Sequence, residues 1–222
     1  MNGEFIATMW PHYVEAGILT VRIGLIGVLG SFVAGLLIAF IRAEKVPILN
    51  GICKAYIEVS RNTPLLIQLF FLYFGLPKLG IVLSSEACAV IGLIFLGASY
   101  MAESIRSGLE AVETGQIEAA KAIGLTKMQR LRYVILPHAM AVAIPSIGAN
   151  TIFLLKETSV FSAVALADLM FVAKDLIGLY YETDEALLML VVSYLLILLP
   201  VAGIFTLLER RLRRGIGLGT AH

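Results

Sequence analysis

The chain has 222 residues, of which 59% are hydrophobic and only 15% are charged, whereas soluble domains carry about 25% charged residues. A globule of this size cannot bury so much apolar surface, so the excess must face lipid, and a mean hydropathy of +0.91 agrees. The net charge of +1 excludes a nucleic-acid partner bound through bulk positive charge, and the apolar composition excludes a disordered chain.

Five runs that are uncharged or nearly so predict membrane helices, because a crossing takes roughly 20 apolar residues. The expected spans are about 16–41, 62–77, 87–102, 138–156 and 186–208. They predict an all-α membrane protein with about five transmembrane helices in a single transmembrane domain over residues 1–222. The second and third spans are short and need flanking residues such as Arg61 to reach the interface. No charged region precedes the first run, so we expect it to remain as a membrane helix rather than act as a cleaved signal.

The distribution of Lys and Arg between the spans predicts the orientation. With the N-terminus outside, the outer segments contain only Lys78 and Lys174. The inner segments contain thirteen cations, namely Arg42, Lys45, Lys54, Arg61, Arg106, Lys121, Lys127, Arg130, Arg132, Arg210, Arg211, Arg213 and Arg214. This positive-inside asymmetry predicts an outer N-terminus and a cytoplasmic C-terminus.

The segment 46–60 is too polar to cross the membrane, and its pattern predicts an amphipathic helix on the inner surface. Its apolar residues recur at helical spacing, at Ile48, Ile52, Tyr56 and Val59. Lys54 and Glu58 fall on the other side of this helix. Thr63 and Pro64 then match the N-cap and first position of the next helix.

The loop between the third and fourth spans, about 103–137, is much longer than two neighbouring helices need, which indicates a binding function. Residues 118–124 predict a short helix of strong helix formers that ends at Gly124. Thr126 and Gln129 match a capping box that begins a second helix, and Pro137 is expected to end it. The two helices predict a stiff cytoplasmic protrusion, although an ordinary solvated hairpin would show the same spacing.

The sequence resembles a known family in several stretches that occur in the family's order. Glu118-Ala119-Ala120, then Gly124, then Ile135-Leu136-Pro137 resemble the EAA motif of the membrane subunits of bacterial ATP-binding-cassette (ABC) importers. Other stretches resemble the polar amino-acid branch of that family, at 56–59, 61–66, 68–71, 102–108 and 155–159. The resemblance extends from about Ala16 to Arg214. Asn62 stands where the family often has glycine, and Glu157 stands where it often has aspartate. These differences bear on which substrate is carried rather than on membership of the family.

The resemblance implies a type I ABC importer permease fold in the bacterial cytoplasmic (inner) membrane, with membrane lipid around it. It also implies a second permease subunit, identical or related, two ATPase subunits and an extracytoplasmic amino-acid-binding protein. The docking helix would couple ATP hydrolysis to alternating access through Gln116, Glu118, Ala119, Ala120, Lys121, Gly124 and Leu125. The sequence has no Gly-x-x-x-x-Gly-Lys-Ser/Thr phosphate loop, so we expect ATP and Mg on the partner ATPase and no cofactor on this chain.

Ionisable residues inside the spans are candidate substrate ligands, because charge within lipid is costly. Lys156 and Glu157 end a long apolar run, and the polar residues that follow could complete a broken helix of the kind that builds transporter sites. The resemblance places the transported amino acid at Lys156, Glu157, Glu103 and Ser99, with Lys156 suited to the substrate carboxylate; Gln68 and Ser159 complete the candidate set.

Several charged residues also have simpler interpretations. Arg22 and Arg61 lie near the ends of spans, where snorkelling anchors are expected. Glu103 follows 16 uncharged residues, which make about 24 Å of helix and place it near the inner boundary. Cys53 and Cys88 are expected to be packing residues.

Three classes of function remain open from the residues alone. The first is an ATP-driven permease subunit for a polar amino acid. The second is an ion-coupled secondary amino-acid carrier, although the long inner loop and the lack of an internal repeat disfavour it. The third, an intramembrane enzyme, is disfavoured because the sequence has no His-Glu-x-x-His or Gly-x-Ser-x-Gly motif. We therefore expect a transport subunit with no catalytic residue and no metal site.

Overall fold

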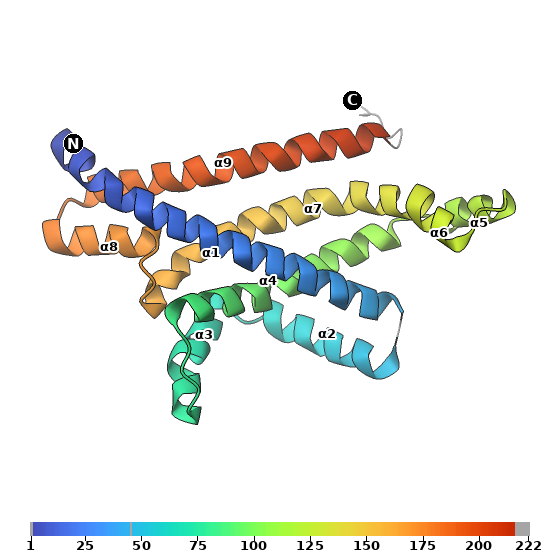
Figure 1. The fold of residues 1–222 in the computed structure, drawn as a ribbon, viewed down its shortest axis with the longest axis horizontal. Helices are drawn as coiled ribbons and strands as arrows, with labels where there is room; N and C mark the ends of the chain where they lie inside the picture. The colour runs from blue at the N-terminus through green and yellow to red at the C-terminus, as the bar shows by residue number, and fades with distance from the viewer. Residues whose placement is uncertain (1, 45, 216–222) are drawn as a thin grey trace.

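The computed structural model describes residues 2–44 and 46–215, with side chains up to Leu212. Lys45 and the side chains of Arg213 and Arg214, which were counted among the inner cations, lie outside the described residues. The described elements are all helical (Figure 1). In chain order they are α1 Gly3–Ala43, α2 Pro47–Arg61, α3 Leu65–Phe70, η1 Phe71–Gly75, η2 Leu76–Leu79, α4 Ser85–Glu110, α5 Thr114–Ala122, α6 Lys127–Arg130, η3 Leu131–Ile135, α7 Leu136–Glu157, η4 Thr158–Val164, α8 Leu169–Tyr180 and α9 Thr183–Gly215.

Four stretches of helix are long and apolar enough to cross a membrane: Gly3–Ala43, Ser85–Glu110, Lys127–Val164 and Thr183–Leu212. A fifth apolar helix, Leu65–Leu79, is shorter and extends about 20 Å at 1.5 Å per residue, less than the roughly 30 Å of bilayer hydrocarbon. In Figure 1 the N-terminus and α8 lie at one end of the bundle, and the α5–α6 hairpin and the end of α9 lie at the other. The two ends of the described chain therefore lie at opposite ends of the bundle.

The long helices extend beyond the predicted apolar runs. Helix α1 begins at Gly3 rather than near residue 16, because Asn2 caps it by accepting from the Phe5 amide and Glu4 lies in its first turn. Helix α4 continues past residue 102 to Glu110. Arg106 stabilises this last part by pairing with Glu103, one turn before it, and Glu110, one turn after it. Hydropathy detects the apolar part of such a helix and misses its polar ends.

The prediction that Pro137 ends the second cytoplasmic helix is wrong. Helix continues without interruption from Lys127 to Val164, with Pro137 in the first turn of α7. A π-helical turn, Leu131–Ile135, precedes the proline. Such a turn shifts the carbonyl register, so the helix can pass a residue that has no amide hydrogen to donate. The connection from the hairpin into the membrane is therefore a single helix.

The prediction that Thr63 caps the next helix is also wrong. Helix α3 begins at Leu65 after Pro64, and the Thr63 hydroxyl instead donates backward to the Val59 carbonyl at 2.8 Å. At the junction between α2 and α3, the side-chain amide of Gln68 donates hydrogen bonds to the carbonyl oxygens of Ser60 (3.1 Å) and Thr63 (2.9 Å).

Helix α2 matches the predicted amphipathic helix, but its apolar stripe faces away from the protein. Ile48, Ile52 and Val59 are exposed, whereas the helix packs through Cys53, Ile57 and Ser60. Cys53 and Cys88 are both buried and free, in agreement with packing roles. The outward apolar stripe is typical of a helix that rests against lipid.

Helices α1 and α4 pack closely along their length, since small residues let the two backbones approach. A Cβ atom added at Gly35 would lie 2.9 Å from the Ala102 amide nitrogen and 3.0 Å from the Ala98 carbonyl oxygen. The main core joins these helices to α3, α7 and η4 around residues such as Leu93, Leu154 and Phe161. A second core joins the first part of α1 to α8 and α9 around Tyr13, whose hydroxyl donates to the Ala186 carbonyl at 2.7 Å.

The segment 157–185 contains two short helices, η4 and α8. Asp168 caps α8 by accepting from the Phe171 amide at 2.9 Å. The Thr20 hydroxyl accepts from the Leu169 amide at 3.2 Å, so a side chain of α1 ties the start of α8 to the bundle.

Candidate functional site

The α5–α6 hairpin is the candidate coupling site, and its turn is built by backbone hydrogen bonds around Gly124. Gly124 has a φ of 82°, a left-handed conformation that glycine adopts without steric cost. The Leu125 amide donates to the Ala120 carbonyl at 3.1 Å and the Gly124 amide to the Lys121 carbonyl at 2.9 Å. This pair of bonds is the Schellman motif, which satisfies the last carbonyls of α5 and sets the direction of the chain that follows.

The second helix of the hairpin begins with the predicted capping box. The Gln129 amide donates to Thr126 Oγ1 at 3.3 Å, and the Thr126 amide donates to Gln129 Oε1 at 2.8 Å. Arg130 Nη1 also donates to the Leu125 carbonyl at 2.6 Å, which fixes the linker between the two helices. The hairpin thus has a defined shape although little of it packs against the bundle.

The predicted coupling residues form an exposed surface on this hairpin. Glu118, Ala119, Lys121 and Gly124 are exposed, Gln116 and Leu125 are partly buried, and Ala120 is buried. Sequence reasoning missed two apolar side chains at the tip, Ile123 at 77% exposed and Met128 at 70%. Neither belongs to a periodic pattern, so only the structure reveals that both apolar side chains are exposed at the tip.

The structure places Glu103 in an ionic cluster at the inner part of α4. Its carboxylate pairs with the guanidinium groups of Arg42 from α1 and Arg106 from α4, the latter at 2.7 Å. Arg106 also pairs with Glu110 at 2.5 Å. Glu103 therefore ties α1 to α4.

Ser99 and Gln68, both predicted as substrate ligands, come together through Ser60. Ser99 Oγ lies 3.1 Å from Ser60 Oγ and donates to the Leu96 carbonyl at 2.7 Å. Gln68 donates to the Ser60 carbonyl at 3.1 Å, and Gln68 Oε1 is buried without a partner in the described chain. All three side chains are buried, so this cluster joins α2, α3 and α4 from inside.

A polar strip runs along α4 and α7; it consists of Tyr100 and Ser104 of α4 and Ser146, Asn150 and Phe153 of α7. Sequence reasoning missed most of it. Asn150 Nδ2 donates to Ser104 Oγ at 2.8 Å, and Ser104 Oγ lies 2.7 Å from Ser146 Oγ. The rings of Tyr100 and Phe153 lie 5.2 Å apart at their centroids. The small polar residues carry no charge and therefore gave no signal in the hydropathy pattern.

Arg61 joins this strip from the end of α2. Its guanidinium carbon lies 5.0 Å above the Tyr100 ring, a cation–π contact one helical turn before Glu103. Arg61 thus contacts α4 through the Tyr100 ring, and its predicted role as an interface anchor stays a prediction.

Lys156, Glu157 and Ser159 lie at the junction of α7 and η4. The side chain of Lys156 is exposed, and those of Glu157 and Ser159 are partly buried. The Thr158 hydroxyl donates to the Leu155 carbonyl at 2.8 Å where α-helix changes to 3-10 helix. Glu157 shares a face of α7 with Asn150 and Phe153, at spacings of seven and four residues. The candidate anionic group therefore points along the same side as the polar strip.

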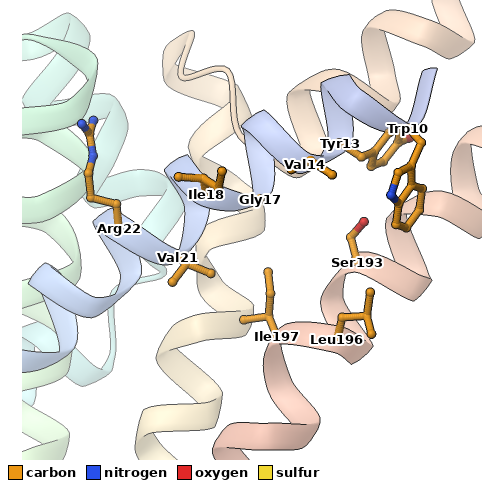
Figure 2. A pocket seen from close by; sticks show the side chains of 10 residues that line it. All are labelled: Trp10, Tyr13, Val14, Gly17, Ile18, Val21, Arg22, Ser193, Leu196 and Ile197. Atoms are coloured by element: carbon orange, nitrogen blue, oxygen red, sulfur yellow. The ribbon is translucent and has the colours of Figure 1, made fainter. Parts of the chain in front are cut away.

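A further hollow of 530 Å³ lies between α1 and α9 (Figure 2). It is lined mainly by apolar side chains such as Val14, Ile18 and Ile197, with Ser193 as a polar group. Arg22 also lines it, but its guanidinium pairs with Glu86 of α4 at 2.6 Å. This hollow lacks the paired polar groups that a zwitterionic amino acid needs, so the polar strip is the better candidate for that ligand.

These features define a class of protein, a multi-pass membrane transport subunit with an exposed coupling hairpin. The profile of the family described as "Binding-protein-dependent transport system inner membrane component" matches residues 27–214, so the chain belongs to this family. It is a permease subunit of the ABC importers of polar amino acids, a transport component rather than an enzyme.

The relatives and solved structures agree with this assignment. The probable glutamine ABC transporter permease protein GlnM of Bacillus subtilis (strain 168) is 31% identical over 96% of this chain and 99% of its own. The glutamine transport system permease protein GlnP of Escherichia coli (strain K12) is 32% identical over 93% of this chain and 97% of its own. A chain from the crystal structure of an amino acid ABC transporter with histidines aligns with a TM-score of 0.87 and 31% identity, over 95% of this chain and 99% of that one. The MetNI methionine ABC transporter aligns at a TM-score of 0.74 and 21% identity, over 92% of this chain and 98% of that one, which shows the shared fold.

Proposed function

We propose that this chain is the permease through which a polar amino acid enters the cytoplasm by alternating access across the bacterial inner membrane. The observation that carries the proposal is the hairpin Thr114–Arg130, whose exposed surface continues into the helix Lys127–Val164. A partner that moves the hairpin would move a membrane span with it. The names of the glutamine permeases GlnM and GlnP support a substrate of the polar amino-acid class.

The proposed assembly contains a second permease subunit, identical or related, two ATPase subunits and an extracytoplasmic amino-acid-binding protein. The ATPase subunits hold ATP and Mg, and each receives one hairpin through Glu118, Ala119 and Lys121 of the exposed surface. The binding protein delivers the amino acid to the outer end of the bundle.

The proposed substrate site combines the polar strip with the end of α7. Lys156 provides a fixed cation for the substrate carboxylate, and Glu157 accepts from the substrate ammonium. Glu103, Ser99, Gln68 and Ser159 remain in the proposed set, although Glu103, Ser99 and Gln68 already bond within the chain. Arg61 is an alternative carboxylate partner, since its contact with Tyr100 holds a second cation beside the strip.

Reconstitution tests the class of function. The assembled complex in proteoliposomes, with the binding protein outside, should take up labelled glutamine only when ATP is supplied to the ATPase side. Uptake driven by a proton or sodium gradient in the absence of ATP would instead identify an ion-coupled carrier.

A pair of lysine variants tests the substrate site. Lys156→Ala should strongly reduce uptake, because it removes the cation that is proposed to hold the substrate carboxylate. Lys174→Ala, an exposed lysine of α8, should change uptake little. Uptake at the wild-type level in Lys156→Ala, with a loss in Arg61→Ala, would assign the substrate carboxylate to Arg61.

A further inference from the structure

A polar cavity of 630 Å³ lies where the ends of α1 and α4 meet the start of α2. Its polar lining comes from all three helices: Arg42 from α1, Asn50 and Lys54 from α2, and Arg106 and Glu110 from α4. The cavity is separate from the polar strip and from the coupling hairpin. All three lysine and arginine residues belong to the segments predicted to face the cytoplasm.

The charges around this cavity do not balance. Arg42 and Arg106 share the carboxylate of Glu103, and Arg106 also pairs with Glu110. Lys54 has no ion pair among the described residues, so the three lining cations share two carboxylates, of which only Glu110 lines the cavity. The cavity therefore provides an uncompensated positive charge, which favours an anion.

The start of α2 adds to this attraction. No acidic residue lies in its first turn, and Val46 provides no side-chain cap for the first amide groups. Asn50, one turn into the helix, lines the cavity. The positive end of the helix dipole thus lies close to the cavity without an anionic side chain to balance it.

The two faces of α2 place the cavity at the level of lipid headgroups. Asn50 and Lys54 line the cavity, whereas Ile52 and Tyr56 line an apolar groove of 530 Å³ with residues of α1 and α4. These two pairs are offset by two residues, about 200° around the helix, so they lie on nearly opposite faces. The groove reaches Ala98 of α4, and the cavity begins at Arg106, about 12 Å farther along the helix. Helix α2 therefore separates an apolar, lipid-facing groove from a polar, basic cavity.

We propose that this cavity binds the phosphate headgroup of an anionic phospholipid of the inner leaflet. Lys54 donates to the phosphate oxygens beside the charge of Arg42, and the exposed Ile48 and Leu49 of α2 contact the acyl chains. A lipid fits better than a soluble anion because these apolar side chains lie in the same turn of α2 as Asn50. Basic pockets between membrane helices on the cytoplasmic side are typical sites for such headgroups.

Native mass spectrometry of the assembled transporter tests this proposal, with phosphatidylglycerol and phosphatidylcholine as probes. The wild-type complex should retain phosphatidylglycerol in preference to phosphatidylcholine. Lys54→Gln should weaken phosphatidylglycerol binding about fivefold, since one lysine near an anionic lipid surface contributes about that factor. Lys54→Arg should restore it, and Lys78→Gln, which removes an exposed lysine at the other end of the bundle, should leave it unchanged.

Three results would overturn the proposal. An unchanged lipid preference in Lys54→Gln would remove the cavity as the site. Displacement of the bound species by millimolar inorganic phosphate would show that the cavity selects a soluble anion. Protection of Lys54 from acetylation by the ATPase subunits, but not by phosphatidylglycerol, would show that this surface belongs to a protein interface. Because lipid binding is measured without transport, failure of the proposed function would leave this test intact.

Discussion

Asp168 predicts a pH dependence of stability that can be isolated with one substitution. Its side chain is fully buried at the start of α8, and Oδ2 has no hydrogen-bond partner in the described chain. Burial raises the pKa of this carboxyl to about 7, although the amides of Phe171 and Met170 and the charge of Lys174 oppose the rise. Tyr194 of α9 is the other titratable group beside it.

The sign of the effect follows from the raised pKa. The folded protein holds the proton more tightly than the unfolded chain, so the stabilising contribution is complete below about pH 4 and is lost as pH rises to about 7. A rise of the pKa from its ordinary value of 3.8 to about 7 corresponds to at most about 4 kcal/mol, because one pKa unit is about 1.36 kcal/mol. Stability should therefore fall by about 1.4 kcal/mol per pH unit between these limits from this residue alone.

Asp168→Asn should remove this dependence. Asparagine keeps the oxygen that accepts from the Phe171 amide, and it is as good an N-cap as aspartate. The apparent unfolding temperature of the purified complex, measured across this pH range, should be similar for wild type and variant at the acid end and higher for the variant at pH 8. Asp175→Asn, at an exposed position of α8, serves as the control and should follow the wild type. A difference between wild type and Asp168→Asn that stays constant with pH would show that the carboxyl titrates normally and would refute the reasoning.

Two pairs of glycines give further predictions. Gly124→Asp should uncouple ATP hydrolysis from transport, since a non-glycine residue at a φ of 82° costs about 1 kcal/mol or more in the turn. Gly80, outside the hairpin, has the same φ of 82°, so Gly80→Asp should have the same local cost while ATPase stimulation and uptake remain coupled. Equal coupling in the two variants would show that the hairpin does not transmit the coupling. Gly108→Ala should destabilise the bundle, because its Cβ would lie 2.5 Å from the Ala139 carbonyl oxygen and push α4 from α7. A Cβ added at Gly178 would have no atom within 4 Å, so Gly178→Ala should raise helix stability slightly. A thermal shift assay in which Gly108→Ala is more stable than Gly178→Ala would contradict the packing argument.

Local sequence signals predicted the hairpin well because its structure is locally determined. The capping box of Thr126 and Gln129 and the turn at Gly124 depend on residues that are neighbours in sequence, and both are confirmed. The same local reasoning failed at Pro137, where a π-helical turn five residues long lets the helix continue. A π-turn is set by packing over several turns, so no residue pattern near Pro137 announces it.

The candidate substrate site was less predictable because its parts come from distant segments. Hydropathy singled out charged residues such as Lys156 and Glu157, which remain candidate ligands. It gave no sign of the contacts among Arg61, Tyr100 and Phe153, which depend on how α2, α4 and α7 pack. Glu103 was predicted both as a ligand and as a residue of the inner boundary, and its pairing with Arg42 adds a contact between α1 and α4 that only tertiary structure reveals.

The unbroken helix Lys127–Val164 has a mechanical consequence. A helix of this length extends about 57 Å at 1.5 Å per residue, so it can act as a lever that reaches from the hairpin to the outer segment. The π-turn Leu131–Ile135 lies near one end of this lever, where a change in helical register would alter its angle with little loss of backbone hydrogen bonds. A small rotation imposed at α6 would then be amplified over the remaining length into a displacement of Lys156 and Glu157. The helix that carries the candidate ligands would thus also transmit the force that moves them.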